Sequence, residues 1–216
     1  MSQPNNPTGQ ILSQAEVQSI VRIADQHGTW ILADEVYRGA ERSGEESPTF
    51  SGRGERIIVT GGLSKVYGLP GLRIGWLVAP ADRVRAALEI KDYTTIAPAT
   101  ISEVLAEIAL ERRKQLLERA RFLVNERWPM LEDWAGGRSR ELHWTAPAAG
   151  AICFFSYKYP IDSIALVDRL IREYSTMIVP GIHFRAERHL RIGFGMLPRV
   201  LHSGLAAIDR LLTSLD

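Results

Sequence analysis

Residues 60–76 read TGGLSKVYGLPGLRIGW, a run of glycine and apolar residues that holds one lysine, Lys65, and one arginine, Arg73. A run of this composition is expected to be buried. Burying an unpaired charge in a protein interior costs roughly several kcal/mol of folding free energy. Two interpretations follow. The run is a surface turn in which residues 68–71 reverse the chain and Lys65 is solvated. Alternatively, Lys65 is a desolvated amine nucleophile and Arg73 binds an anion.

The sequence on both sides of this run predicts an α/β layer. Ser13 and Glu16 have the spacing of a capping box and open a helix. The apolar run WILADEVY follows it, and the polar residues 41–56 form a loop. Helix, strand, loop, strand, turn and strand then succeed one another, as in an α/β fold. The expected strands are 29–34, 57–61 and 72–78.

The second half of the chain predicts a smaller α+β unit. A long helix is expected from about Pro98 into the 120s, with its many charges on a solvated face. Gly136 and Gly137 interrupt this pattern. Strands are then expected in GAICFFSYK, STMIVPG and HLRIGFG, and helices at 163–174 and 199–214. We therefore expect one domain over residues 1–118 and a C-terminal domain over 119–216.

The composition is that of an ordinary globular protein and excludes several classes. The 216 residues carry a net charge of +1, which gives no sign of a nucleic-acid or acidic-membrane partner. The one cysteine, Cys153, sits in an apolar run and has no partner for a disulfide, which favours a reducing compartment. No apolar stretch reaches the ~20 residues of a membrane span. The polar start MSQPNNPTGQ does not resemble a secretory signal, so we expect a cytoplasmic protein.

Four short motifs occur in order along the chain, and together they carry more weight than any one of them. They are NNPTG at 5–9, ADEVY at 33–37, LSKVYGLPGLR at 63–73 and HLRIGFG at 189–195. This ordered set resembles the class I/II aminotransferases, which are pyridoxal-phosphate enzymes of fold type I. The resemblance implies the later part of the large domain, with a mainly parallel sheet, followed by a small α+β C-terminal domain.

The resemblance also assigns a role to each motif. Lys65 matches the catalytic lysine that forms an imine with pyridoxal 5'-phosphate. Asp34 matches the carboxylate beside the ring nitrogen, which keeps that nitrogen protonated. The remaining matches are Asn6 and Tyr37 for the ring's phenolic oxygen, Ser64 and Arg73 for the phosphate, and Arg191 with Asn6 for the substrate.

Each motif also has a plain structural interpretation. NNPTG could be only an Asn-Pro turn, Asp34 and Glu35 a solvated strand end, and Tyr37 a packing residue. Arg191 could be a surface charge on a strand. His183 and His189 have no partner at metal-ligand spacing, so no metal is expected.

The chain departs from the family pattern in three places. Many members have a hydroxyl three residues before the lysine, where this chain has Gly62, so Ser64, Thr60 or backbone N–H groups would have to replace it. Arg185 stands where relatives often have glycine. NNPTG also lies close to Met1, whereas family enzymes have a long N-terminal half, so we expect the chain to be the C-terminal part of such an enzyme.

The expected function is transfer of an amino group between an α-amino acid and a 2-oxo acid, in a homodimer without nucleic-acid or membrane partners. The isolated chain is expected to be weakly active or inactive. Lyase or decarboxylase chemistry on the same motifs, and an inactive cofactor-binding remnant, are the alternatives.

Overall fold

The computed structural model describes residues 1–215, which form two compact units. The first unit holds residues 1–6, 10–121 and 148–150. The second holds residues 7–9, 122–147 and the chain from Ala151 onward. Each unit has its own sheet and its own buried cluster of apolar side chains, and each is described separately below.

The sheet of the first unit has three strands in the order β1 (Ile31–Asp34), β2 (Ile57–Gly62) and β3 (Gly75–Val78). β1 and β2 are parallel, whereas β2 and β3 are antiparallel. The sheet is therefore mixed, where a mainly parallel sheet was expected. The difference arises because the short connection through residues 63–74 returns the chain directly beside β2, and a parallel return needs a longer crossover.

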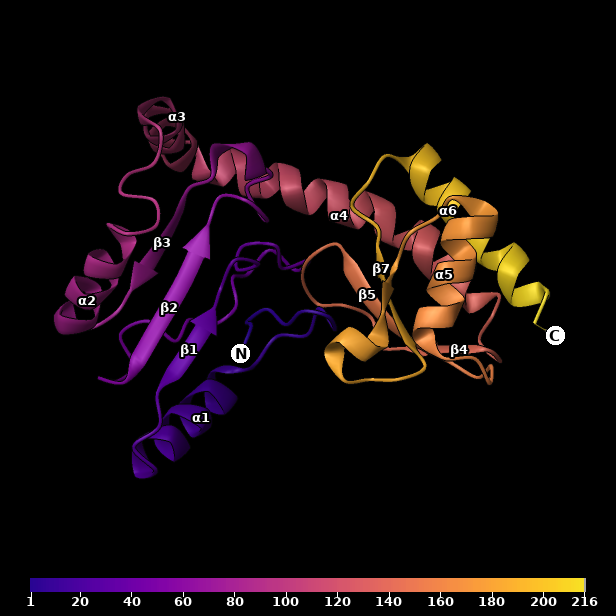
Figure 1. The fold of residues 1–216 in the computed structure, drawn as a ribbon, viewed down its shortest axis with the longest axis horizontal. Coiled ribbons are helices and arrows are strands. Elements are labelled where there is room, and N and C mark those ends of the chain that lie inside the picture. The colour runs from indigo at the N-terminus through magenta and orange to yellow at the C-terminus, as the bar shows by residue number, and fades with distance from the viewer. Residues whose placement is uncertain (216) are drawn as a thin grey trace. The chain divides into compact units, whose positions relative to one another are not determined.

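Helix α1 (Gln14–Gln26) packs on one face of this sheet, and the ribbon shows it next to β1 (Figure 1). Ser13 and Glu16 form the expected capping box: the Ser13 hydroxyl accepts from the Glu16 N–H, and the Glu16 carboxylate accepts from the Ser13 N–H. Val17 and Val21 lie on the buried face of the helix. They belong to a cluster with alternate residues of β1 and β2: Ile31, Ala33, Ile57 and Val59.

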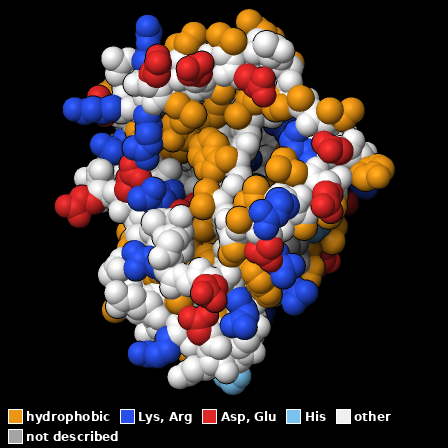
Figure 2. Space-filling model, turned by 90° about the vertical axis from the view of Figure 1, so that its left-hand side faces the viewer, with side chains coloured by type: hydrophobic (Ala, Val, Ile, Leu, Met, Phe, Trp, Pro, Cys, Tyr) orange, Lys and Arg blue, Asp and Glu red, His pale blue; other side chains and the backbone are white. Residues whose placement is uncertain are grey.

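Strand β3 is exposed along its whole length, so the expectation of a buried run is wrong for this part. Two helices follow β3: α2 (Ala81–Lys91), which the sequence did not predict, and α3 (Thr100–Glu111). Apolar side chains of these elements gather on the face seen in Figure 2. They include Trp76, Leu77, Val78, Leu88, Ile90, Ile101, Val104, Leu105 and Ile108.

The long helix expected from about Pro98 is two helices, because the α-helix stops at Arg112 and resumes as α4 (Arg113–Gly136). No glycine or proline marks this break in the sequence. The first part of α4 belongs to the first unit and the remainder to the second.

The sheet of the second unit is antiparallel throughout, with β4 (Leu142–Trp144), β5 (Ile152–Tyr157), β7 (His189–Gly193) and β6 (Val179–Pro180) in that order. β4 is short and was not predicted. Helices α5 (Ser163–Tyr174) and α6 (Pro198–Thr213) accompany it, close to their expected bounds (Figure 1). Alternate strand residues Cys153, Phe155, Leu190 and Ile192 are buried in one cluster with these helices.

Candidate active site

The first unit brings three chain segments to the same edge of its sheet. Asp34 at the end of β1 is in register with Thr60 of the parallel strand β2, which ends two residues later at Gly62. Ser2 makes a parallel bridge to Asp34, and the Asp34 N–H donates to the Met1 carbonyl at 2.9 Å. The segments that leave this edge carry Asn6, Tyr37 and Lys65. In open α/β sheets, ligands bind outside the carboxyl ends of the parallel strands.

The loop that carries Asn6 is fixed by the buried side chain of Gln3. The Gln3 amide oxygen accepts from the Leu12 N–H at 3.1 Å, and its amide nitrogen donates to the Leu12 carbonyl at 3.4 Å. The Asn6 N–H donates to the Ser2 hydroxyl at 2.9 Å. Asn6 is half-buried and its backbone is thereby attached to the segment that runs beside β1.

Asp34 is the last residue of β1, and Tyr37 lies in the turn over residues 36–39 that follows it. The Asp34 carboxylate is half-exposed and accepts from the Val36 N–H at 3.2 Å. Tyr37 is half-buried, and its carbonyl accepts from the Ala40 N–H at 3.0 Å. Glu35, in contrast, is buried and accepts from the Phe50 N–H at 2.7 Å and from the Thr49 hydroxyl. A solvated strand end is therefore wrong for Glu35.

Lys65 lies in a closed loop between β2 and β3. The loop is held by two backbone bonds: the Leu63 N–H donates to the Ile74 carbonyl at 3.1 Å, and the Leu69 N–H donates to the Leu63 carbonyl at 3.0 Å. The Lys65 side chain is exposed, so it is not desolvated within this chain.

Lys65 differs from the other three lysines of the sequence in having no ionic or hydrogen-bond partner among residues 1–215. Lys91 donates to the Ile96 carbonyl. The Lys114 amine lies 4.0 Å from the Glu118 carboxylate, and the Lys158 amine 3.7 Å from the Glu141 carboxylate. The Lys65 amine is therefore open to a ligand.

Gly62 and Ser64 lie at the start of this loop, and Gly62 stands where many members of the family have a hydroxyl. A Cβ atom at Gly62 would lie 3.2 Å from the Ile74 carbonyl oxygen, tighter than most real contacts, so β2 and β3 approach too closely for a comfortable side chain. Ser64 is half-buried, and no hydrogen bond of its hydroxyl occurs within the described part of the chain. The Ser64 hydroxyl is thus a free donor beside Lys65.

Arg73 closes the same loop in a left-handed conformation, with φ of 56°. It follows the short 3-10 helix η1 (Pro70–Leu72), and its guanidinium donates to the Pro70 carbonyl at 3.0 Å. Non-glycine residues hold this conformation at a cost, and such strain concentrates at functional sites. The Arg73 side chain is otherwise exposed.

Arg191 lies on β7 in the second unit, so six of the seven predicted site residues share the first unit and Arg191 does not. Arg191 is half-buried, and its guanidinium carbon lies 5.3 Å from the centre of the Phe184 ring. Phe154 on β5 is its cross-strand partner.

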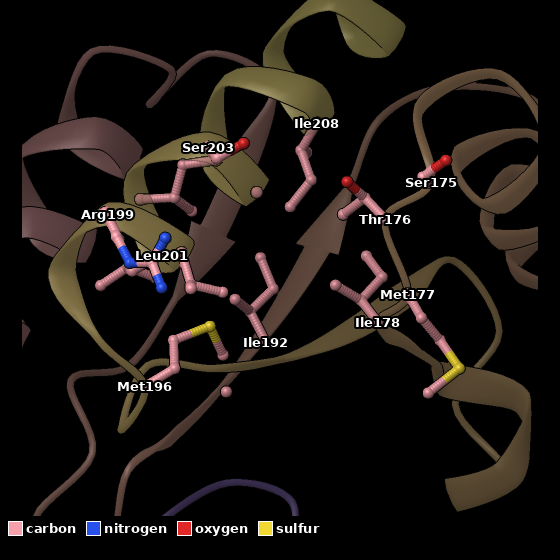
Figure 3. A pocket seen from close by; sticks show the side chains of 14 residues that line it. Ser175, Thr176, Met177, Ile178, Ile192, Met196, Arg199, Leu201, Ser203 and Ile208 are labelled. Atoms are coloured by element: carbon pink, nitrogen blue, oxygen red, sulfur yellow. The ribbon is translucent and has the colours of Figure 1, made fainter.

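The second unit also contains a cavity of about 540 Å³ that none of the seven predicted residues lines (Figure 3). Ile178, Ile192, Leu201 and Ile208 form its apolar wall (Figure 3). Because successive strand residues point to opposite faces, Ile192 and Arg191 project from opposite sides of β7. The cavity is therefore on the other face from Arg191.

Three further features of the described residues concern a thiol, metal ligands and helix character. Cys153 is fully buried, and burial raises the pKa of its thiol to about 12, so a reactive thiolate is not formed near neutral pH. Among residues 1–215, no three His, Cys, Asp or Glu side chains are grouped to hold a metal ion. Within the same range, no helix combines the length and apolar character that crossing a bilayer requires.

The sequence missed the carboxylates that hold the loop after Tyr37. Glu41 is buried and accepts from the Gly39 N–H at 2.7 Å and from both the N–H and the hydroxyl of Ser47. Glu46 forms ion pairs with Arg38 and Arg113. These residues lie in a segment rich in charge and glycine, so the sequence pattern resembled a solvated loop.

Comparison with known proteins identifies the family. The family described as "Aminotransferase class I and II" matches residues 1–208. The chain belongs to this family. A PLP-dependent aminotransferase from Streptococcus suis superposes on all of the chain, with a TM-score of 0.91 and 29% identity, and the chain covers 57% of that structure. The fold is therefore that of the pyridoxal-phosphate enzymes of fold type I, as the sequence predicted.

Two curated relatives that match the chain carry different names. An aspartate aminotransferase from Streptomyces avermitilis is 26% identical over 97% of the chain and 55% of the relative. Capreomycidine synthase from Streptomyces vinaceus is 32% identical over 72% of the chain and 40% of the relative. The chain thus spans about half the length of the relatives it matches.

The residues of the first unit fit pyridoxal 5'-phosphate, the cofactor of this family. An amine and a hydroxyl without partners among the described residues, Lys65 and Ser64, lie on one loop. A carboxylate, Asp34, lies at the neighbouring strand end. A cofactor with an aldehyde, a basic ring nitrogen and a phosphate needs this set of donors.

Proposed function

We propose that the chain acts in an aminotransferase that moves an amino group between an α-amino acid and a 2-oxo acid. The observation that carries the proposal is Lys65: an exposed lysine without a partner in residues 1–215, held by a closed loop where β2 ends. The match to the aminotransferase family over residues 1–208 supports it. We also propose that the chain divides into one domain over residues 1–118 and a C-terminal domain over residues 119–216.

Six residues would hold the cofactor, each by its own chemistry. Lys65 would bind the aldehyde carbon through Nζ. Asp34 would keep a proton on the ring nitrogen, while Asn6 and Tyr37 would donate to the phenolic oxygen. The phosphate would lie between the Ser64 hydroxyl and the Arg73 guanidinium, with charge-assisted hydrogen bonds. These six are Asn6, Asp34, Tyr37, Ser64, Lys65 and Arg73.

Bound pyridoxal phosphate supplies a protonated ring that withdraws electrons from the substrate's α-carbon. The chain's own residues would do the rest. Once the substrate's amino group has replaced it at the aldehyde carbon, Lys65 Nζ would be a free amine that takes the α-proton as a general base and returns it as a general acid. Arg191 would hold the substrate's α-carboxylate by two parallel hydrogen bonds, and Asn6 would also bind the substrate. The bound carboxylate would fix the direction in which the α-proton points.

The test is cofactor binding with matched lysine variants. We expect pyridoxal phosphate to bond covalently to the chain, followed by the change in its absorbance, and we expect Lys65→Ala to abolish this change and Lys114→Ala to leave it. Release of 2-oxo acid from amino acids is measured in the same samples, and a slow rate is expected from the chain alone. The same absorbance change in Lys65→Ala would contradict the proposal.

A second reaction on the same site is supported by one relative. Capreomycidine synthase, which is not named as an aminotransferase, is 32% identical to this chain. Elimination or decarboxylation would use the same lysine and ring carboxylate. Product analysis separates the reactions, because only amino-group transfer consumes one 2-oxo acid for each amino acid.

The surroundings of the protein are also proposed. We infer a homodimer in the cytoplasm without nucleic-acid partners. The net charge of +1 gives no electrostatic attraction to phosphate backbones, and a single cysteine suits a reducing compartment.

A further inference from the structure

Three rings of the second unit lie on the same side of its sheet as Arg191, the arginine proposed to bind the substrate, and one of them contacts it. Phe154 lies on β5, His189 on β7, and Phe184 at the end of the 3-10 helix η2 (Gly181–Phe184). We call these three residues the aromatic bracket. Arg191 is in register with Phe154, and alternation along β7 places His189 on the same side as Arg191.

The rings contact one another in a chain that ends on the guanidinium. The His189 and Phe154 rings are stacked, with centroids 4.9 Å apart and planes at 22°. The Phe154 and Phe184 rings meet edge to face, with centroids 5.7 Å apart at 80°. The Arg191 guanidinium carbon then lies 5.3 Å from the Phe184 centroid, within the range of a cation–π contact.

The turn that carries Phe184 is held in place from outside the bracket. The Ile182 N–H donates to the Ser163 hydroxyl at 3.3 Å, and the Ser163 N–H donates to the Glu187 carboxylate at 2.6 Å. A Cβ atom at Gly181 would lie 2.2 Å from the Ala186 carbonyl oxygen, so the turn is also closed by a direct backbone approach. Phe184 is therefore presented by a rigid segment.

We propose that Phe184 is a positioning residue, whose ring fixes the plane of the Arg191 guanidinium for a two-point grip on the substrate carboxylate. The proposal rests on the function proposed above for Arg191. An arginine side chain has many rotamers, and ordering them on binding weakens affinity. A ring that holds the guanidinium beforehand removes part of that cost, because it contacts the face of the guanidinium and not the plane in which the N–H bonds lie.

The test compares carboxylate binding by variants of the 216-residue chain, with 2-oxoglutarate as the probe and NMR titration as the measurement. Phe184→Leu keeps apolar bulk and removes the ring face, so we expect binding about fivefold weaker, the size of a partly exposed cation–π contact. Phe184→Trp restores a ring face and should bind as tightly as the wild type or more tightly. Ile182→Ala, an exposed change on the same turn, should bind like the wild type.

The outcomes separate this inference from the function on which it depends. Arg191→Lys should weaken binding further than Phe184→Leu, because the planar fork is lost. If Arg191→Lys binds as the wild type does, or the wild type shows no saturable binding, the role of Arg191 is wrong and the inference falls with it. If Arg191→Lys is weakened but Phe184→Leu is not, only the positioning role is overturned. Unfolding midpoints measured on all variants show whether the Phe184→Leu chain folds. If it does not fold, Phe184→Trp decides the matter. Binding as tight as the wild type's supports the inference, and a loss of binding by the folded variant overturns it.

Discussion

Replacing Glu41 with glutamine should loosen the loop that follows Tyr37. The Glu41 side chain is 1% exposed, and its carboxylate accepts three hydrogen bonds: from the Gly39 N–H at 2.7 Å, the Ser47 N–H at 2.9 Å and the Ser47 hydroxyl at 2.7 Å. In Glu41→Gln one oxygen still serves Ser47, but an NH2 group then faces the Gly39 N–H. One charge-assisted bond is lost and a buried donor is left without an acceptor.

The cost follows from those two changes. A hydrogen bond to a charged group contributes about 1.5–3 kcal/mol, and an unsatisfied buried donor costs about 1–3 kcal/mol, with overlap between the two figures. We expect Glu41→Gln to destabilise the loop by about 2–4 kcal/mol. Glu41→Ala, which strands all three donors, should cost more. Glu45→Gln is the matched control, since Glu45 is an exposed residue of the same loop, and it should change stability by less than about 0.5 kcal/mol.

The assay is native-state hydrogen exchange at the amides of Gly39 and Ser47, because it reports this loop separately from the second unit. About 2–4 kcal/mol corresponds to exchange roughly 30 to 900 times faster. Amides of β5, in the other unit, should exchange at the wild-type rate. If Glu41→Gln and Glu45→Gln exchange alike at Gly39 and Ser47, the buried carboxylate does not hold the loop and this reasoning is refuted.

Three further predictions concern stability and association. Gly204→Ala in α6 should stabilise the second unit by about 0.5–1 kcal/mol in urea unfolding, because the nearest atom to the new methyl would lie 4.0 Å away; a loss of stability would contradict this. The Arg138 hydrogen bond lowers the pKa of Asp209 below its unfolded value of about 3.9. The stabilisation that this ion pair gives the folded state is therefore complete above the unfolded pKa and is lost as the pH falls through the lower folded value. Asp209→Asn should therefore cost about 0.5–1 kcal/mol at pH 7, with the difference from wild type shrinking below about pH 4, and an equal cost at pH 2 would exclude this ion pair as the cause. The exposed apolar strand β3 should drive concentration-dependent association in sedimentation velocity, which Leu77→Glu reduces; a monodisperse wild type over a wide concentration range would argue against it.

Elements with strong local signals could be predicted from the sequence. The capping box at Ser13 placed the start of α1, and Asp162, which caps α5 by accepting from the Ala165 N–H, lies just before the predicted start of that helix. The direction of β3 could not be predicted, because strand propensity does not distinguish a parallel from an antiparallel neighbour. Its exposure could not be predicted either, since an apolar run is expected to be buried.

The residues of the candidate site also fall into those that the sequence indicated and those that it missed. Strand-end motifs indicated Asp34 and Lys65, and the structure places both where the parallel strands finish. The buried Glu35 and Glu41 were missed because their partners, Phe50 and Ser47, lie 15 and 6 residues further along the chain in a segment that looks solvated. The contact of Arg191 with Phe184 depends on the conformation of the turn between β6 and β7, which no periodicity reveals.

The central claim is that Lys65 is the residue that binds the cofactor covalently. The direct measurement is borohydride reduction of the chain after incubation with pyridoxal phosphate, followed by peptide mapping of the pyridoxyl label. Lys65 alone among the four lysines is without a partner in the described residues, so the label is expected there and not on Lys91, Lys114 or Lys158. A label confined to any other lysine, or spread equally over all four, would contradict the account.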